Sequence, residues 1–410
     1  MTRRAALAAA AVLALGLSWA PPTRAGDDAP PDLYQDALQS IAEGRKNDAS
    51  ATLNSIIVNE PQHAGAWLDL ALIQCSLGNE AEAERMFDVI LQRFAPPPGI
   101  IELIASTRAT GCSQWHPHSD YSITMARGID QNVNQGAATP NLLIDSGSGP
   151  ELLPLQSDFL PKHDQYSALW LDYARDLTAN GTTGFVQFQD RRNDRQHQYD
   201  SGSLFVGAET PWRAGHWTAT ATGTLGLFSL GGQYYQRQSQ VQLKVGPPLP
   251  LPERTQFTLT AALSHNKYMT LSNFDAIASE LRGQLVHRAD NGSLSASMAW
   301  LTDRALSDRP GGNRHGWLAS VTARRTISGP VSGELGYSQQ DWRSSSAYSP
   351  GLIDATRAEA TQIGRASMTW SLGGGHSLQL EARRVRNAEN ISIFQYNDRQ
   401  LQLSWQWLAQ

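Results

Sequence analysis

Residues His216–Leu227 read HWTATATGTLGL, and this stretch decides which fold class the chain is assigned to. Alternate residues of an extended chain share one face. One face here is apolar and carries Trp217, Ala219, Ala221, Gly223, Leu225 and Leu227. The opposite face is mostly hydroxylic and carries Thr218, Thr220, Thr222, Thr224 and Gly226. A period of two predicts a β-strand whose two faces meet different surroundings.

The same alternation recurs from about Ser119 to the end of the chain. It is clearest at 255–264, 317–324, 377–383 and 400–407. Short connections rich in turn residues occur at 178–182, 211–215, 246–254, 288–292, 326–330 and 372–376. Longer polar connections alternate with them, at 130–163, 190–200, 227–235, 265–274, 302–314, 343–357 and 387–392. These turns and loops separate fourteen strands of roughly 9–13 residues, the length that a tilted membrane strand needs.

Two fold types fit an alternating pattern, a soluble β-sandwich and a membrane barrel. Five tryptophans lie near predicted strand ends, where an aromatic belt is expected: Trp217, Trp317, Trp370, Trp405 and Trp407. This placement of the tryptophans and the regular alternation of short turns with long loops favour the barrel. We therefore expect residues 115–410 to form a fourteen-stranded antiparallel outer-membrane β-barrel. Lipid would contact Trp217 and its companions, and the threonines would line the interior.

The N-terminus has the features of an export signal. Two arginines precede an apolar run over residues 5–17, and Thr23 and Ala25 supply the small residues of a cleavage site. About 13 apolar residues are too few for a membrane-spanning helix, which needs roughly 20. Residues 1–25 are therefore predicted to be a cleaved signal peptide. The formal net charge of −5 offers no basic field to a nucleic-acid partner.

Residues 26–114 contain a repeat at an offset of 34 positions. The matched pairs are Ala37 with Ala71, Gly44 with Gly78, Ala49 with Ala83, and Leu53 with Phe87. Small residues where helices touch, a glycine at the turn and a bulky apolar residue in the second helix resemble the tetratricopeptide repeat. A further helix at about 100–110 is predicted to cap this short solenoid.

Solenoids of this kind usually bind their clients on an extended concave face. The candidate client-binding residues are Trp67, Leu70 and Gln74. The alternative is a helical spacer without a ligand. Cys75 and Cys112 are the only cysteines of the chain. In an exported protein they either form a disulfide bond or remain two buried small side chains, and the sequence leaves both interpretations open.

Charges of both signs fall on the predicted inner faces of the later strands: Arg324, Glu334, Arg365, Glu381 and Arg383. Such residues suit a hydrated or polar lumen. The arginines could form a basic ladder that guides an anionic client. They could also pair with the two glutamates and hold the interior together, which is the interpretation we favour.

The chain contains no H-E-x-x-H, no G-x-S-x-G and no P-loop. We therefore predict a non-enzymatic protein without a cofactor or a metal. His116 and His118 lie two residues apart without a third ligand nearby, which is typical of a solvated linker.

Two stretches carry a family resemblance, PPGIIELIASTRA at 97–109 and ARGIDQNVNQGA at 126–137. Together with the helical repeats they resemble the family of the surface lipoprotein assembly modifier (Slam). The resemblance implies periplasmic tetratricopeptide repeats joined to a fourteen-stranded outer-membrane barrel whose first strand ends near a D-x-N-x-N signature. The matching residues are Asp130, Asn132 and Asn134. Their oxygen atoms either coordinate a cation or form Asx turns that begin the first loop.

The family resemblance implies an outer-membrane translocator whose periplasmic repeats hold an exported protein or lipoprotein client on its way to the cell surface. Its other expected partners are outer-membrane lipid and, during biogenesis, the barrel assembly machinery. Exopolysaccharide export porins share the layout, usually with more repeats and a larger barrel, and provide one alternative function. A structural or receptor barrel without transport is the other.

Overall fold

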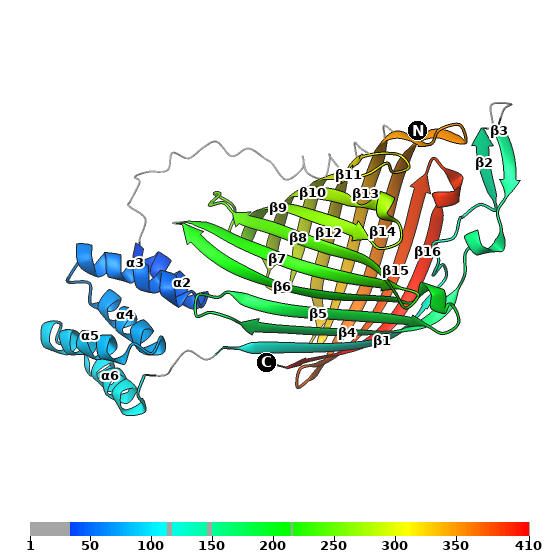
Figure 1. The fold of residues 1–410 in the computed structure, drawn as a ribbon. Coiled ribbons are helices and arrows are strands. Elements are labelled where there is room, and N and C mark those ends of the chain that lie inside the picture. The colour runs from blue at the N-terminus through cyan, green and yellow to red at the C-terminus, as the bar shows by residue number, and fades with distance from the viewer. Residues whose placement is uncertain (1–32, 113–116, 146–149, 215, 410) are drawn as a thin grey trace.

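The computed structural model describes residues 33–112, 117–145, 150–214 and 216–409 (Figure 1). The predicted signal peptide, residues 1–25, lies outside these ranges. Helices come first, and a large barrel follows from Ser119 to Ala409. The helices lie at one end of this barrel, which we call the helix end. We call the opposite end, where the longer connections lie, the loop end.

The described N-terminal part folds into five helices: α2 (Leu33–Ala42), α3 (Lys46–Asn59), α4 (Ala64–Ser76), α5 (Glu80–Arg93) and α6 (Pro98–Thr110). Helices α2 with α3 and α4 with α5 form two hairpins. Positions matched at the 34-residue offset occupy equivalent, fully buried places in both hairpins: Ala37, Ala71, Ala49, Ala83, Leu53 and Phe87. The repeat in the sequence is therefore a repeat in packing.

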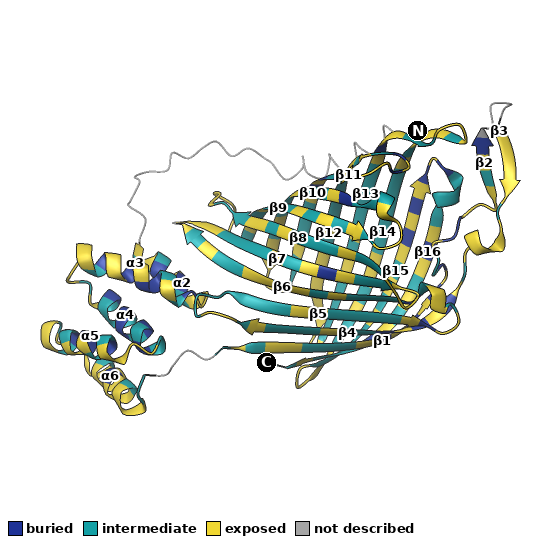
Figure 2. Cartoon of the chain, in the orientation of Figure 1, coloured by how far each residue is buried: buried dark blue, intermediate teal, exposed yellow. Residues whose placement is uncertain are grey.

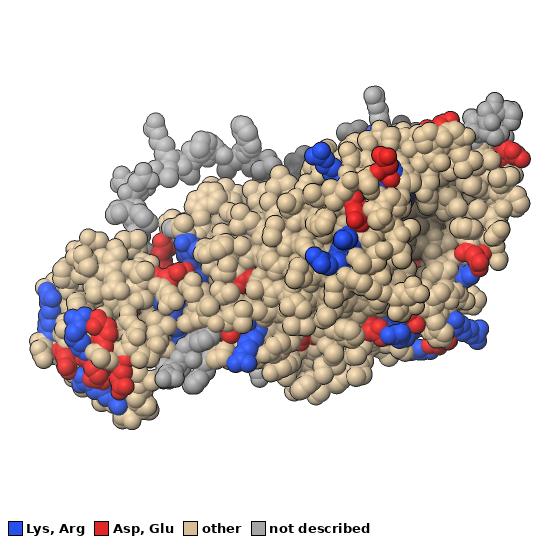
Figure 3. Space-filling model, viewed as in Figure 1, with Lys and Arg blue, Asp and Glu red and all other residues tan. Residues whose placement is uncertain are grey.

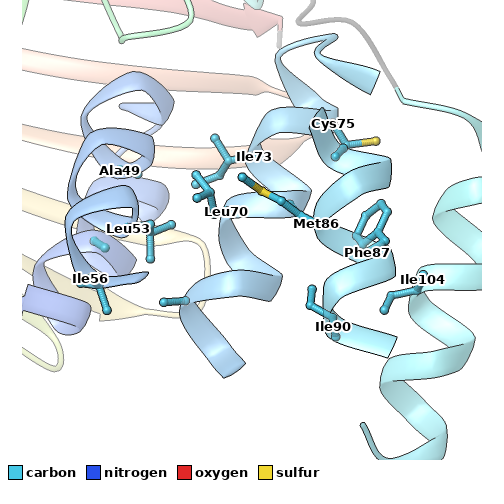
Figure 4. Packing of buried hydrophobic residues seen from close by; sticks show 14 residues of the cluster. Ala49, Leu53, Ile56, Leu70, Ile73, Cys75, Met86, Phe87, Ile90 and Ile104 are labelled. Carbon is cyan, nitrogen blue, oxygen red and sulfur yellow. The ribbon is translucent and has the colours of Figure 1, made fainter. Parts of the chain in front are cut away.

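One apolar core runs through both hairpins and ends on α6 (Figure 4). Leu53 on α3, Leu70 on α4 and Phe87 on α5 have no exposed surface, and Ile104 brings α6 against them. Burying apolar side chains of this size stabilises the fold by about 1.5–3 kcal/mol each. The core gives α6 its predicted place as a cap on the last hairpin.

Polar and covalent contacts also hold α6 in place. Arg108 forms ion pairs with Glu84 and Asp88 on α5, with N–O distances of 2.8 and 2.7 Å. Cys75 on α4 and Cys112 just after α6 form a disulfide bond. Of the two interpretations that the sequence left open, the structure therefore shows the bonded pair.

Fourteen strands form one closed antiparallel barrel, as predicted. Strand β1 pairs with β4 on one side and with β16 on the other, which closes the ring. The strands are β1 (Ser119–Asp130), β4 (Asp164–Asp176), β5 (Thr183–Asn193), β6 (Ser201–Ala214), β7 (Trp217–Leu230), β8 (Gln233–Gly246), β9 (Thr255–Tyr268), β10 (Ala276–Ala289), β11 (Gly292–Ala305), β12 (Arg314–Ser328), β13 (Val331–Ser349), β14 (Ile353–Gly373), β15 (His376–Glu389) and β16 (Tyr396–Ala409). A small separate hairpin, β2 (Asn141–Asp145) with β3 (Pro150–Pro154), interrupts the first long connection.

Burial alternates along the barrel strands with the predicted period of two (Figure 2). On β7, the side chains of Trp217, Leu225 and Leu227 are exposed, at 51%, 58% and 42%. Residues paired directly across neighbouring strands share a face, and Leu225 lies opposite Val206, which is 47% exposed. The apolar residues of the quoted stretch therefore belong to the outer wall, and the threonines belong to the inner one.

Two of the predicted long loops are mostly strand. The segment 227–235 contains only a two-residue turn, Gly231 and Gly232, whose φ angles are +59° and +77°. Glycine adopts this left-handed region without steric penalty. The segment 343–357 continues β13 and β14 and leaves only 350–352 between them. Its polar residues suggested a loop because neither face is apolar, as expected for strands that extend beyond an apolar band.

Candidate functional site

The client-binding residues predicted on the helical repeats do not form an open surface. Leu70 has no exposed surface, so the prediction that it contacts a client is wrong: α4 turns this side chain into the core. Trp67 is half-buried, and its indole N–H donates to the Pro61 carbonyl at 3.2 Å. The Gln74 amide donates to the Ser50 hydroxyl at 3.0 Å. The polar groups of both residues therefore serve contacts inside the helical domain.

Helix α2 contacts the helix end of the barrel through Arg213 and His216. The His216 Nδ1 lies 3.7 Å from Asp36 Oδ1. Arg213, near the end of β6, donates from Nη2 to Asp36 Oδ1 at 3.1 Å and to Gln39 Oε1 at 2.8 Å. Its Nη1 lies 3.8 Å from Glu43 Oε1. The side chains of Arg213 and Asp36 are only 8% and 14% exposed. Removing one partner of such a shielded pair is costly, because it leaves the other charge desolvated. This contact therefore fixes the helical domain at the barrel mouth.

The inner wall carries the predicted charges of both signs. Arg365 pairs with Glu334, and its Nη1 lies 3.9 Å from Glu381 Oε2. These residues alternate with the outward Leu335, which is 65% exposed. The pairing that we favoured is thus present at Arg365.

Arg324 and Arg383 differ from Arg365. Arg324 lies opposite Glu334 in the register, and Arg383 lies opposite Arg365. Neither arginine has an ion pair within the part of the chain that the structure describes. Two inward-facing cations therefore remain next to the neutralised Arg365.

The D-x-N-x-N residues lie where β1 leaves the barrel at the loop end. Asp130 is 3% exposed and accepts three hydrogen bonds through its two carboxylate oxygens. Oδ1 accepts from the backbone N–H of Asn132 at 2.8 Å. Oδ2 accepts from Arg191 at 2.6 Å and from Gln400 at 3.0 Å. Asp130 therefore ties the first loop to β5 and β16.

Asn132 and Asn134 bind backbone groups of the first loop and, through Asn132, of β16. Asn132 donates to the carbonyls of Gly136 and Asn397, both at 3.0 Å, and accepts from the Gly136 N–H at 2.7 Å. Asn134 donates to the Leu160 carbonyl at 2.8 Å and accepts from the Lys162 N–H at 2.9 Å. Of the two interpretations of the signature, Asp130 matches the Asx turn, because its Oδ1 accepts from the N–H two residues on. The side-chain oxygens of Asn132 and Asn134 accept from the more distant N–H groups of Gly136 and Lys162.

An aromatic side chain completes this corner of the inner wall. The guanidinium carbon of Arg191 lies 3.8 Å from the centre of the Tyr166 ring, a cation–π contact. The Tyr166 hydroxyl donates to Gln402 at 2.9 Å. Gly128 faces the ring, and a Cβ at this position would lie 2.5 Å from the ring carbon Cζ. Glycine before the signature is therefore required by the close approach of Tyr166.

The described residues do not form a metal-binding site. They contain no group of three or more His, Cys, Asp or Glu side chains arranged to hold an ion. His116 lies outside the described ranges. The His118 Nε2 lies 3.0 Å from the Asp120 carboxylate, and both side chains are exposed.

Sequence reasoning missed a set of buried ion pairs at the loop end. The Glu389 side chain has no exposed surface and lies 2.6 Å from Arg357 Nη2. Arg309, 3% exposed, donates to Asp303 at 2.9 Å, and Arg314 pairs with the same carboxylate. Charged residues near the predicted strand ends were the signal in the sequence that could have pointed to these ion pairs. Their pairing depends on strand register and loop path, which the sequence pattern does not give.

Within the described ranges, no helix is both long enough and apolar enough to cross a membrane. The sequence matches no protein-family model and no curated protein. Several solved structures share the general barrel shape. OmpT, an outer membrane protein of Vibrio cholerae, aligns with a TM-score of 0.41 at 8% identity over 72% of this chain and 99% of its own. The outer membrane channel DcaP of Acinetobacter baumannii gives a TM-score of 0.40 at 9% identity over 72% and 97%. A Pseudomonas aeruginosa FadL homologue gives 0.41 at 9% over 71% and 90%. Likenesses this distant carry no argument about function.

Proposed function

We propose that the barrel spans the outer membrane, with its helix end in the periplasm and its loop end at the cell surface. A closed antiparallel barrel satisfies its backbone hydrogen bonds without a free edge, as a membrane strand must. Its outer wall exposes large apolar side chains, among them Leu225, Met298 and Leu335 at 58%, 58% and 65%. In the view of Figure 3 most of the wall is free of charged side chains. Acyl chains are the solvent that suits this surface.

Within this placement we infer a non-enzymatic translocator that helps an exported protein or lipoprotein reach the cell surface. The observation that carries this proposal is the docking of α2 on the barrel through Arg213. The docking puts the helical repeats at one mouth of the barrel. In the membrane placement proposed here this mouth is periplasmic, and a client bound to the repeats would be delivered to the barrel there. The resemblance of the repeats and of the D-x-N-x-N signature to the Slam family supports the same function.

The buried ion pairs at the loop end favour this function over steady export of a polysaccharide. Arg309 and Asp303 are nearly inaccessible to solvent, and Glu389 is fully buried beside the partly exposed Arg357. Separating the two partners of such an ion pair leaves each charge without its partner. A client that passes between them must therefore offer contacts that replace the lost ones. A protein client that folds at the surface can supply such contacts. A permanently wet sugar pore would instead keep its lining charges hydrated.

Deleting the gene and digesting intact cells with a protease tests the translocator function. We expect one or a few surface proteins to disappear from the digest, while matrix polysaccharide is unchanged. Loss of the polysaccharide with an intact set of surface proteins would overturn the proposal in favour of sugar export. No change in either leaves a barrel without transport.

A charge reversal tests the docking that carries the proposal. Arg213→Glu expressed at wild-type level should reproduce the deletion, because it repels Asp36 and Glu43. Arg325→Glu is the matched control, since Arg325 is exposed near the helix end of β12 and contacts no helix through an ion pair among the described residues. Normal surface display in Arg213→Glu cells would contradict the delivery role of the helical domain.

A further inference from the structure

A groove of about 610 Å³ lies on the outer wall of the barrel over β12 to β16. Its floor is made of small residues that meet in the register. Gly364 lies between Tyr337 and Arg384, and Ala366 lies between Leu335 and Ala382. A Cβ built on Gly364 would meet no atom within 4 Å, so the space above this residue is open. The floor of this groove, which we call the furrow, is therefore apolar.

Two arginines lie at the end of the groove that is nearer the loop end of the barrel. Arg384 on β15 and Arg399 on β16 lie directly opposite each other, and both are exposed. Among the described residues neither has a carboxylate within ion-pair distance, whereas Arg127, Arg192 and Arg357 each have at least one. Like charges directly opposite each other destabilise a sheet. An anion between the two guanidinium groups would reverse this repulsion.

The arginines lie where the outer wall changes from apolar to polar. Toward the helix end, the next outward residues are Ala382 and Leu401. Toward the loop end, they are Arg386 and Asn397. In a bilayer this boundary is the level of the lipid headgroups. The groove descends from it toward the middle of the apolar band, as an acyl chain does.

A second groove on the outer wall provides an internal comparison. It has about 800 Å³, lies over β6 to β11 and is also floored by small residues, including Ala221, Gly223 and Ala261. No arginine or lysine lines it among the described residues. Ordinary acyl chains suffice to fill this second groove. Of the two grooves, the first alone combines a furrow of this size with two arginines that have no ion-pair partner among the described residues.

We propose that the first groove binds an outer-leaflet lipid with a phosphorylated headgroup. The phosphate bridges Arg384 and Arg399, and one acyl chain lies over Gly364 and Ala366. Guanidinium groups present paired donors that match phosphate oxygens. The proposal rests on the membrane placement proposed above, which puts the loop end in the outer leaflet.

Native mass spectrometry of the full-length protein in detergent tests this site, with bisphosphorylated lipid A as the probe. We expect the double variant Arg384→Gln/Arg399→Gln to bind lipid A about tenfold more weakly or worse, because two charge-assisted contacts are lost. Gly364→Val should weaken binding as well, since it fills the furrow without a clash. Matched controls are Arg304→Gln, an outward arginine at the loop end of β11, and Gly223→Val in the second groove, and both should bind like the wild type.

Three results would overturn the lipid site. The first is unchanged lipid A binding by Arg384→Gln/Arg399→Gln. The second is complete displacement of lipid A by inorganic phosphate together with wild-type binding by Gly364→Val, which reduces the site to a phosphate contact. The third is a dimer that Gly364→Val dissolves, which makes the furrow an interface between two copies. A wrong membrane placement would give a different result from a wrong lipid site: the mature chain would stay monomeric and soluble without detergent.

Discussion

The side chain of Asn132 is almost fully buried and joins three parts of the chain. It contacts the backbone of Gly136 in its own loop and that of Asn397 at the start of β16. Its own N–H is held by Asp130. An amide that both donates and accepts is the residue type that can satisfy these groups together. At this position the side chain replaces missing strand pairing where β1 ends.

Asn132→Ala should destabilise the barrel by about 1–3 kcal/mol, because the buried N–H of Gly136 loses its acceptor. Urea titration of the detergent-solubilised protein measures the change. Gln131→Ala is the control, since Gln131 is exposed and next in the chain. Equal stability of the two variants would show that the signature asparagine has no role in holding the loop.

Tyr34 gives the helical domain a dependence on alkaline pH. Burial, followed by the hydrogen bond that its hydroxyl donates to Asp69 at 2.6 Å, raises the pKa of Tyr34 from 10.0 to about 12. A folded pKa above the unfolded one means that the stabilisation is complete below pH 10 and is lost as the pH rises toward 12. Tyr34→Phe should remove this loss. Denaturation midpoints of the helices at about pH 9 and about pH 11 measure it, and an equal drop in both proteins would refute the assignment.

At the scale of elements, sequence periodicity predicted the strands and the helical repeat. It did not predict which side chains of different elements contact each other. The outward face of Trp217 and the equivalence of Ala49 with Ala83 follow from local spacing alone, because burial repeats every second residue in a strand and every 34 in this solenoid. Leu70 was assigned to a surface because spacing does not say which side of a helix meets its neighbour. The pair Arg357–Glu389 joins residues 32 apart, and only the register brings them together.

The disulfide bond should make α6 a stable part of the helical domain. Cys75 and Cys112 are separated by 37 positions and enclose α5 and α6. Closing a loop of this size stabilises a fold by about 2–4 kcal/mol. Adding a reductant should lower the unfolding free energy of the helices by that amount and leave the barrel transition unchanged. Cys75→Ala/Cys112→Ala should start at the lower value and show no response to reductant. A reductant effect in this variant would locate the change elsewhere.

At the scale of the whole molecule, a helical repeat domain and a fourteen-stranded barrel are joined by very few side chains among the described residues. The covalent connection passes from Cys112 to β1, and the second contact among the described residues is the cluster around Arg213 and His216. Residues 36, 39 and 43 all present oxygen atoms to that one guanidinium. His216 adds a longer contact to Asp36, at 3.7 Å, so the orientation of the repeats over the mouth depends mainly on the charge of Arg213.

Reversing that charge should release the helical domain, and reversing its partner as well should restore docking. Arg213→Glu removes a shielded ion pair and opposes it with Asp36, at a cost of about 3 kcal/mol or more. Asp36→Arg combined with Arg213→Glu rebuilds the pair in the opposite sense, so the two changes should be strongly non-additive. Spin labels at exposed positions 92 on α5 and 253 in the β8–β9 connection report the orientation as a distance distribution. We expect one narrow distance in the wild type, a broad distribution in Arg213→Glu and a narrow one again in the double variant. A narrow, unchanged distance in Arg213→Glu would mean that other contacts fix the repeats over the barrel, and the delivery model would lose its structural basis.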